Sequence, residues 1–228
     1  MPVEVTHTPS PNFNDRNEGA VPTVLVVHYT GMVTAEAALR RLCDPRAEVS
    51  AHYLVMEDGE VHQLVSEDKR AWHAGVGVWR GITDLNSASI GVEIVNPGHE
   101  FGYVDFAEEQ MKSVALLAEE IVRRHDIKPW NVIGHSDLAP ERKEDPGEKF
   151  NWKLLASMGI GMWPTKKLGE ARGEAQLIED LKQIGYDCSN LQKTILAFQR
   201  HWRPNILSGL PDEETQRIAR TLCLQLSS

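Results

Sequence analysis

The sequence contains little cysteine and no paired cysteine motif. Its three cysteines, Cys43, Cys188 and Cys223, are far apart and odd in number, so they do not indicate a disulfide framework. We expect them to be small apolar residues within the fold. Because there is no CxxC pair, a metal site in this chain has to be built from histidine and carboxylate side chains.

Long apolar segments and an excess of positive charge are also missing. No window approaches the ~20 apolar residues of a membrane span, so we expect no transmembrane segment. The N-terminal 19 residues, MPVEVTHTPSPNFNDRNEG, have neither the basic nor the apolar region of a secretory signal. We therefore expect a cytoplasmic location, with the periplasm or cell envelope as the alternative if a leader was removed. A formal net charge of −9 predicts no nucleic-acid partner, because phosphate binding needs clustered cations.

The length and composition fit a soluble globular protein with one large and one small domain. The chain has 228 residues, of which 41% are hydrophobic and 25% charged, and it contains no internal repeat. A polar, Pro- and Asn-rich stretch over 1–22 predicts an extended N-terminal arm. We expect the large domain to span 1–168, and a small helical domain to span 169–228, where the pattern changes to short helices.

Strand and helix signals alternate in the large domain. The expected strands are 24–28, a hairpin over 53–65 around Asp58-Gly59, 89–95 and 130–135. The expected helices are 35–43, with Thr34 as N-cap, and about 108–125, with Asp105 and Glu108 as a capping box. This order predicts an α/β fold with a mixed central β-sheet flanked by helices, followed by a small three-helix domain.

Two histidines end apolar strands. His28 follows VLVV and His135 follows NVIG, and a strand end is where a rigid sheet presents side chains to a site. A single histidine there is more often structural, but two beside an acidic loop indicate a metal site. Asp137 and Asp145 are the candidates for a third ligand. Asp137 is better placed to cap a turn, so we favour Asp145, at the end of a loop long enough to fold back.

Two imidazoles and one carboxylate leave a position on Zn²⁺ open for water, as in catalytic zinc sites. Glu93 is the candidate acid or base, since it alternates with the apolar residues of its strand and lies on the opposite face. Lys143, two residues before Asp145, is the candidate group for stabilising a developing oxyanion.

Several segments resemble one family. VLVVHYTGM, SAHYLV, AWHAG, SIGVEIVN and GHSDLAPERKEDPGEKFNW, within residues 22–160, look like the zinc-dependent N-acetylmuramoyl-L-alanine amidases, which include phage lysozyme amidases and peptidoglycan-recognition proteins. The last segment is closest to the AmpD/AmiD branch. The resemblance implies one Zn²⁺ per chain on His28, His135 and Asp145, with Glu93 as acid/base and Lys143 stabilising the transition state. It also implies cleavage between N-acetylmuramic acid, or its anhydro form, and L-alanine in peptidoglycan or muropeptides.

Five further residues are candidates for substrate binding. His52, Trp72 and His73 lie in the matching segments and could line the substrate groove, although ordinary bonded polar groups are the alternative. Asn96 could bind a peptide stem or support a turn. Arg142 could meet a stem carboxylate through a bidentate pair or be a solvated loop charge.

One departure from the family pattern and one further resemblance refine this interpretation. Phage-type members place a tyrosine where this chain has Ala51, so we expect the glutamate route rather than a tyrosine-assisted one. The C-terminal segments LKQIGYD, AFQRHW and DEETQRIAR resemble a three-helix peptidoglycan-binding domain. The alternative there is that Leu191, Ile195, Phe198 and Trp202 form a plain helical core.

Two other classes of protein remain possible from the sequence. A recognition module would bind muropeptides without cutting them, but it has no need of Asp145, Glu93 and Lys143, so we expect catalysis. A zinc peptidase would cut within the stem and leave alanine on the muramyl group. The sequence does not choose between soluble anhydro-muropeptides and polymeric peptidoglycan, and it makes no prediction of oligomeric state.

Overall fold

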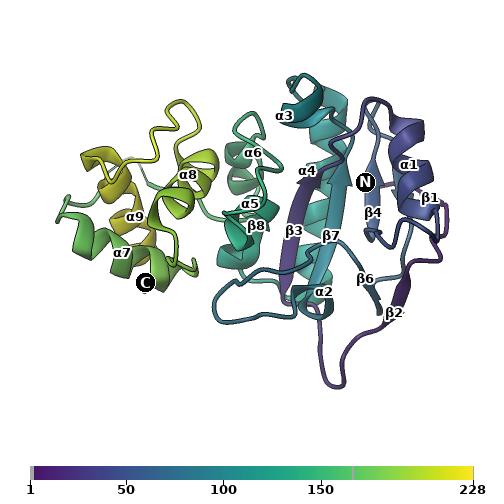
Figure 1. The fold of residues 1–228 in the computed structure, drawn as a ribbon, viewed down its shortest axis with the longest axis horizontal. Helices are drawn as coiled ribbons and strands as arrows, with labels where there is room; N and C mark the ends of the chain where they lie inside the picture. The colour runs from purple at the N-terminus through teal and green to yellow at the C-terminus, as the bar shows by residue number, and fades with distance from the viewer. Residues whose placement is uncertain (1–2, 166, 228) are drawn as a thin grey trace.

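A six-stranded sheet forms the centre of the larger part of the molecule (Figure 1). The structure is a computed structural model and describes residues 3–165 and 167–227. In spatial order the strands are β1 (Val5–His7), β5 (Val61–Gln63), β4 (Tyr53–Val55), β7 (Ser89–Ile94), β3 (Val24–Tyr29) and β8 (Val132–Gly134). Only β4 and β5 pair antiparallel and the other neighbours are parallel, so the predicted mixed sheet is confirmed.

The antiparallel pair is the predicted hairpin. Gly59 has a positive φ of 90°, which glycine adopts without strain, and the Asp58 carboxylate accepts a hydrogen bond from the backbone N–H of Glu60. The turn therefore forms where the Asp-Gly pair predicts it.

One face of the sheet is covered by helix α4 (Glu108–His125), with α6 (Trp152–Ser157) beside it (Figure 1). Ile90, Val92 and Ile94 of β7 are buried on this face, as the alternation predicted. The expected capping box at the start of α4 is wrong, because Ala107 is the N-cap and no side chain caps the helix. The cap of α1 (Ala35–Cys43) is confirmed, since the Thr34 side chain accepts from the N–H of Ala37.

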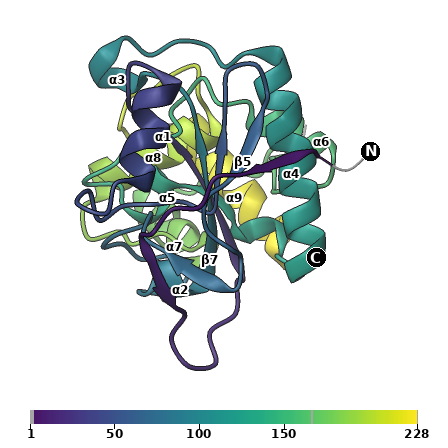
Figure 2. The ribbon, with the colours of Figure 1, turned by 90° about the vertical axis from the view of Figure 1, so that its right-hand side faces the viewer.

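The N-terminal arm is paired with strands rather than lying loosely over the surface. Its first strand, β1, adds to the edge of the main sheet (Figure 2). Its second, β2 (Phe13–Asp15), pairs antiparallel with β6 (Lys69–Ala71). Arg16 then fixes the end of the arm by hydrogen bonds to the backbone carbonyls of Glu67 and Ser87. Residues 1 and 2 lie outside the described residues.

Short helices occupy several connections between the strands and longer helices. They are α2 (Leu85–Ala88), α3 (Gly98–Phe101), the 3₁₀ turn η1 (Pro129–Asn131) and α5 (His135–Leu138). Among the described residues, no helix has the length and apolar character needed to cross a bilayer.

The C-terminal segment contains three longer helices, which lie beside α5 (Figure 1). They are α7 (Glu174–Ile184), α8 (Leu191–Trp202) and α9 (Glu213–Leu226). The side chains of Asn190 and Asp212 cap the starts of α8 and α9. A domain boundary at 168 stays a prediction.

The three C-terminal helices share one apolar core with the sheet. Phe198 and Trp202 of α8 are buried in the same cluster as Val26 of β3 and Ile133 of β8. The face of the sheet opposite α4 is thus partly covered by the C-terminal helices, and the rest of that face carries the candidate site.

Candidate active site

Neighbouring strands present His28 and Glu93 side by side. β3 and β7 are parallel, and His28 lies directly opposite Glu93 in their register. Both residues alternate with side chains that pack against α4, so both project from the opposite face. His135 follows β8 and begins α5 on the other side of β3.

The loop after His135 folds back onto the end of β8. The backbone N–H of Ser136 donates to the carbonyl of Asp145 at 2.9 Å, which closes the loop. Gly134 permits this return, because a Cβ there would lie 2.6 Å from Cδ of Pro146. The segment after His135, which the sequence predicted to be a loop, begins with one helical turn, α5. Asp145, at its end, then reaches the two histidines.

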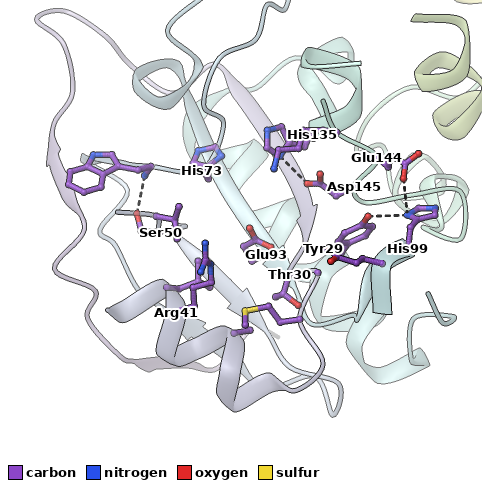
Figure 3. Close-up of a pocket in the computed structure, with 18 of the residues that line it drawn as sticks. Tyr29, Thr30, Arg41, Ser50, His73, Glu93, His99, His135, Glu144 and Asp145 are labelled. Atoms are coloured by element: carbon purple, nitrogen blue, oxygen red, sulfur yellow. Dashed lines mark hydrogen bonds and ion pairs between the residues drawn. The ribbon is translucent and has the colours of Figure 1, made fainter. Parts of the chain in front are cut away.

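Three buried side chains converge on one point. The Nδ1 atoms of His28 and His135 are 2.9 Å apart, and each lies 3.0 Å from Oδ2 of Asp145. Figure 3 shows the contact between His135 and Asp145. Their exposed fractions are 1%, 3% and 6%. Among the described residues, these three form the group that could hold a metal ion.

The hydrogen bonds show where the protons lie in neutral His135. Its Nε2 is 2.9 Å from the carbonyl oxygen of Ala74, and a carbonyl only accepts. Nε2 must therefore carry the proton. The Nδ1 atom of neutral His135 then has a free lone pair directed at His28 and Asp145.

A longer chain of hydrogen bonds shows that Nε2 also carries the proton in neutral His28. Ser89 donates its hydroxyl proton to the carbonyl of Leu85, so its Oγ accepts from Nε2–H of His73 at 3.2 Å. Neutral His73 must then accept at Nδ1, from Nε2–H of His28 at 3.0 Å. Burial lowers the pKa of His28 to about 4, with a smaller contribution from His135, and holds that of His73 well below its usual value. His28 therefore also has its Nδ1 lone pair facing the centre.

Two imidazole lone pairs and a carboxylate oxygen repel one another unless a cation lies between them. With Zn²⁺ bonds of about 2.0–2.1 Å in a tetrahedron, ligand atoms lie about 3.3 Å apart, close to the separations seen here. The outer hydrogen bonds to Ala74 and His73 also fix the ring orientations, as is usual for histidines that bind metal. The residues present fit a zinc ion.

Gly91 makes room for His73 behind His28. A Cβ on Gly91 would lie 2.5 Å from the His73 ring, closer than any real contact. The glycine in the strand that carries Glu93 is therefore required by a close approach rather than by a turn.

Glu93 faces the cleft with an unpaired oxygen. Its Oε2 is buried and has no hydrogen-bond partner among the described residues. Burial and the charge of Asp145 raise the pKa of Glu93 well above its usual value, against the opposing charge of Lys143. Figure 3 shows Glu93 on β7, facing the same space as Asp145 and His135. A buried carboxyl group with a raised pKa and a free oxygen beside a cleft is a candidate acid or base.

The site opens into a cleft of about 430 Å³. Lys143 lies on its wall, together with three of the residues expected to bind substrate, Trp72, His73 and Arg142. The indole N–H of Trp72 donates to Oδ1 of Asn14 at 2.7 Å, and Arg142 donates to the carbonyl of Val76. These contacts hold both side chains at the rim.

The structure places His52 and Asn96 away from the cleft. His52 is fully buried; its Nδ1 accepts from the N–H of Gly91 at 2.9 Å, and its Nε2 lies 3.1 Å from the carbonyl of Lys69. Asn96 is 2% exposed and bonds the backbone of Gly98 and Val104. Both therefore support the backbone near the site, and neither offers a surface to a substrate.

Sequence reasoning missed several cleft residues. They include Tyr29, Thr30, Arg41, His99 and Glu144. Tyr29 and Glu144 are chain neighbours of the candidate ligands His28 and Asp145, so their positions in the sequence were a signal for them. Arg41 enters from α1, and only the packing of that helix brings it to the cleft (Figure 3).

Comparison with known proteins agrees with this geometry. A family model described as N-acetylmuramoyl-L-alanine amidase matches residues 18–148. The N-acetylmuramoyl-L-alanine amidase AmiD of Escherichia coli K12 is 40% identical over 227 aligned residues, covering 87% of this chain and 81% of AmiD. The 1,6-anhydro-N-acetylmuramyl-L-alanine amidase AmpD of Enterobacter cloacae is 35% identical, covering 68% of this chain and 90% of AmpD.

A solved structure of a relative has the same fold. The complex of E. coli AmiD with the substrate anhydro-N-acetylmuramic acid-L-Ala-D-γ-Glu-L-Lys superposes with a TM-score of 0.82 at 37% identity, covering 93% of each chain. The resemblance inferred from the motifs is therefore confirmed. The chain belongs to the N-acetylmuramoyl-L-alanine amidase family.

Proposed function

We propose that this chain is a zinc-dependent hydrolase that cleaves the amide bond between N-acetylmuramic acid, or its anhydro form, and L-alanine. The proposal rests on its family membership and on one observation: two imidazole lone pairs and a carboxylate oxygen converge in a buried site that opens to the cleft. The substrates of AmiD and AmpD contain this bond.

His28, His135 and Asp145 would hold the zinc ion. Three protein ligands would leave a position open for water, as in catalytic rather than structural zinc sites. When bound there, Zn²⁺ supplies a Lewis acid for the amide carbonyl and lowers the pKa of a water molecule toward neutrality.

Glu93 is the proposed proton carrier. Its raised pKa suits a group that takes a proton from the attacking water and then gives one to the leaving nitrogen of alanine. Its second oxygen, Oε2, is available for both proton transfers because no described residue forms a hydrogen bond with it.

Lys143 is the proposed partner of the negative charge that develops on the carbonyl oxygen. It lies on the cleft wall and is carried by the same loop as Asp145, so its position is tied to the ligand. Arg142, beside it at the rim, is proposed to bind a stem carboxylate, and Trp72 and His73 to line the groove.

The test is product analysis with purified protein and anhydro-muropeptides. We expect free stem peptide beginning with alanine, and we expect its release to stop on chelation and return with zinc. Alanine left on the muramyl group would instead identify a peptidase. Binding without release would identify a recognition module.

The C-terminal helices are proposed to bind peptidoglycan. The prediction rests on their sequence resemblance alone, since the stripe residues Ile195, Phe198 and Trp202 are buried in the core. Pull-down on intact sacculi, compared with turnover of soluble anhydro-muropeptides, tests both the binding and the choice of substrate. Failure to bind sacculi would leave the helices with a structural role.

A further inference from the structure

Helix α8 contacts the loop that carries most of the active site. His135, Lys143 and Asp145 all lie on the segment 135–145, which leaves β8 and returns to it. Two adjacent residues of α8, Arg200 and His201, each contact this segment, and they do so near its opposite ends.

The first contact is made by Asp137, two residues after His135. Asp137 is fully buried, and its Oδ2 accepts from the backbone N–H of Gly134 at 2.8 Å and from Nδ1 of His201 at 2.7 Å. Its other oxygen accepts from the hydroxyl of Tyr186 at 2.5 Å. One carboxylate thus ties the turn that presents His135 to two residues of the C-terminal segment, Tyr186 after α7 and His201 of α8.

His201 is held tightly in its position. Its ring is stacked between the indoles of Trp152 and Trp202, with ring centroids 3.8 Å apart on both sides. Trp152 belongs to α6, in the sheet-containing part of the molecule. The imidazole therefore has little freedom to follow Asp137 if the loop moves.

The second contact is an ion pair at the returning end of the loop. Nη2 of Arg200 lies 2.5 Å from Oε1 of Glu144, the residue between Lys143 and Asp145. The Arg200 side chain is 10% exposed, so this guanidinium is largely removed from solvent. The loop is thus held near both ends by neighbouring residues of one helix.

We propose that helix α8 positions the active-site loop, with His201 and Arg200 as positioning residues that set the placement of His135 and Asp145 through Asp137 and Glu144. This role rests on the proposed metal site, and it is separate from any binding of peptidoglycan by the C-terminal helices. Outer contacts of this kind tune the affinity and geometry of a metal site without touching the ion.

The C-terminal helices have an attachment that does not involve the loop. The guanidinium of Arg80 donates to the carbonyl of Ile184 at 2.6 Å, and its backbone N–H donates to the carbonyl of Gly185 at 2.9 Å. These bonds, together with the shared apolar core, keep the helices docked when a single contact to the loop is removed.

The test compares variants at the end of α8 in the 228-residue chain. His201→Phe removes the Nδ1–H donor but keeps a flat ring between the indoles, and Arg200→Met removes the ion pair. Arg203→Met is the matched control, since Arg203 pairs with Asp212 and Glu214 inside the helical segment and, among the described residues, forms no hydrogen bond or ion pair with the loop. Zinc affinity by chelator competition and the visible spectrum of the Co²⁺-loaded protein report on the ligand geometry.

We expect a ~10–100-fold loss of zinc affinity for His201→Phe, with a changed Co²⁺ spectrum and a lower kcat at little-changed KM. Arg200→Met should have a smaller effect, because Glu144 is half exposed and solvent screens its charge. Arg203→Met should lower thermal stability but leave affinity and spectrum as in the wild type. His201→Asn, which can place an amide N–H near the lost donor, should recover part of the affinity.

The inference is overturned if His201→Phe and Arg200→Met both keep wild-type zinc affinity and Co²⁺ spectrum, or if Arg203→Met changes them equally. If His201→Phe does not fold, His201→Asn and Arg200→Met still decide the question. A wild-type protein that binds neither Zn²⁺ nor Co²⁺ would refute the proposed function itself, which is a different outcome.

Discussion

Replacing Glu93 with glutamine tests its role in proton transfer separately from any structural role of the side chain. The amide has nearly the same shape as the carboxyl group, and no described residue bonds Oε2, so the change breaks no hydrogen bond at that atom. General acid–base catalysis contributes about 10²–10⁴-fold, which corresponds to about 2.7–5.4 kcal/mol of transition-state stabilisation. We therefore expect kcat to fall by about that factor, with zinc content unchanged because Glu93 is not among the three residues proposed to bind zinc.

Glu93→Gln should also change how the stability of the fold depends on pH. Since the pKa of Glu93 is raised in the folded state, the wild type is penalised once the pH rises above the unfolded-state pKa of about 4.3. In chelator-treated protein, Glu93→Gln should thus match the wild type near pH 4, become progressively the more stable one above that, and keep a constant advantage once the pH exceeds the folded-state pKa. Urea unfolding across this range measures the difference.

Two controls decide the interpretation of Glu93→Gln. Elemental analysis must show a full complement of zinc, and Glu93→Ala should lose as much activity as the glutamine variant. Turnover above about one tenth of the wild-type rate in both variants would mean that another group moves the proton, because a tenfold loss is only about 1.4 kcal/mol.

Three further predictions concern the metal and the C-terminal helices. His28→Ala and Asp145→Ala should each abolish stoichiometric zinc by elemental analysis; a full complement in both would remove them as ligands. His73→Phe should weaken zinc binding by ~10–100-fold, because Nε2–H of His28 loses its acceptor, and chelator competition should reveal it; unchanged affinity would contradict the proton assignment. Asp212→Asn should cost roughly 1–2 kcal/mol at neutral pH, allowing for partial exposure. Burial alone would raise the pKa of Asp212, but hydrogen bonds led by Arg203 lower it to about 2. The stability cost of Asp212→Asn should therefore vanish as the pH falls from about 4 to below about 2. A cost that does not depend on pH would refute the argument.

The strand-borne part of the site could be predicted because it depends on local pattern. Alternation along β7 put Glu93 on the face opposite Ile90 and Val92, and apolar runs ended at His28 and His135. Local pattern did not decide between Asp137 and Asp145. The length of the loop before Asp145 favoured it, and the family resemblance supported that choice.

The missed features depend on contacts between distant segments. His73 lies behind His28 only because Gly91 of another strand leaves room for its ring. His52 belongs to a motif that resembles the family, yet burial and two backbone contacts give it a supporting place. Likewise, nothing local in the sequence shows that Asp137 meets His201, 64 residues away.

The apolar cluster shared by the sheet and the C-terminal helices has a thermodynamic consequence. Phe198 and Trp202 belong to the same buried cluster as Ile133, so we expect unfolding of the helices and of that side of the sheet to be coupled. We expect a single calorimetric transition rather than two, with equal calorimetric and van't Hoff enthalpies. By the same reasoning, a chain cut at residue 168 would present a newly wetted hydrophobic surface and tend to self-associate.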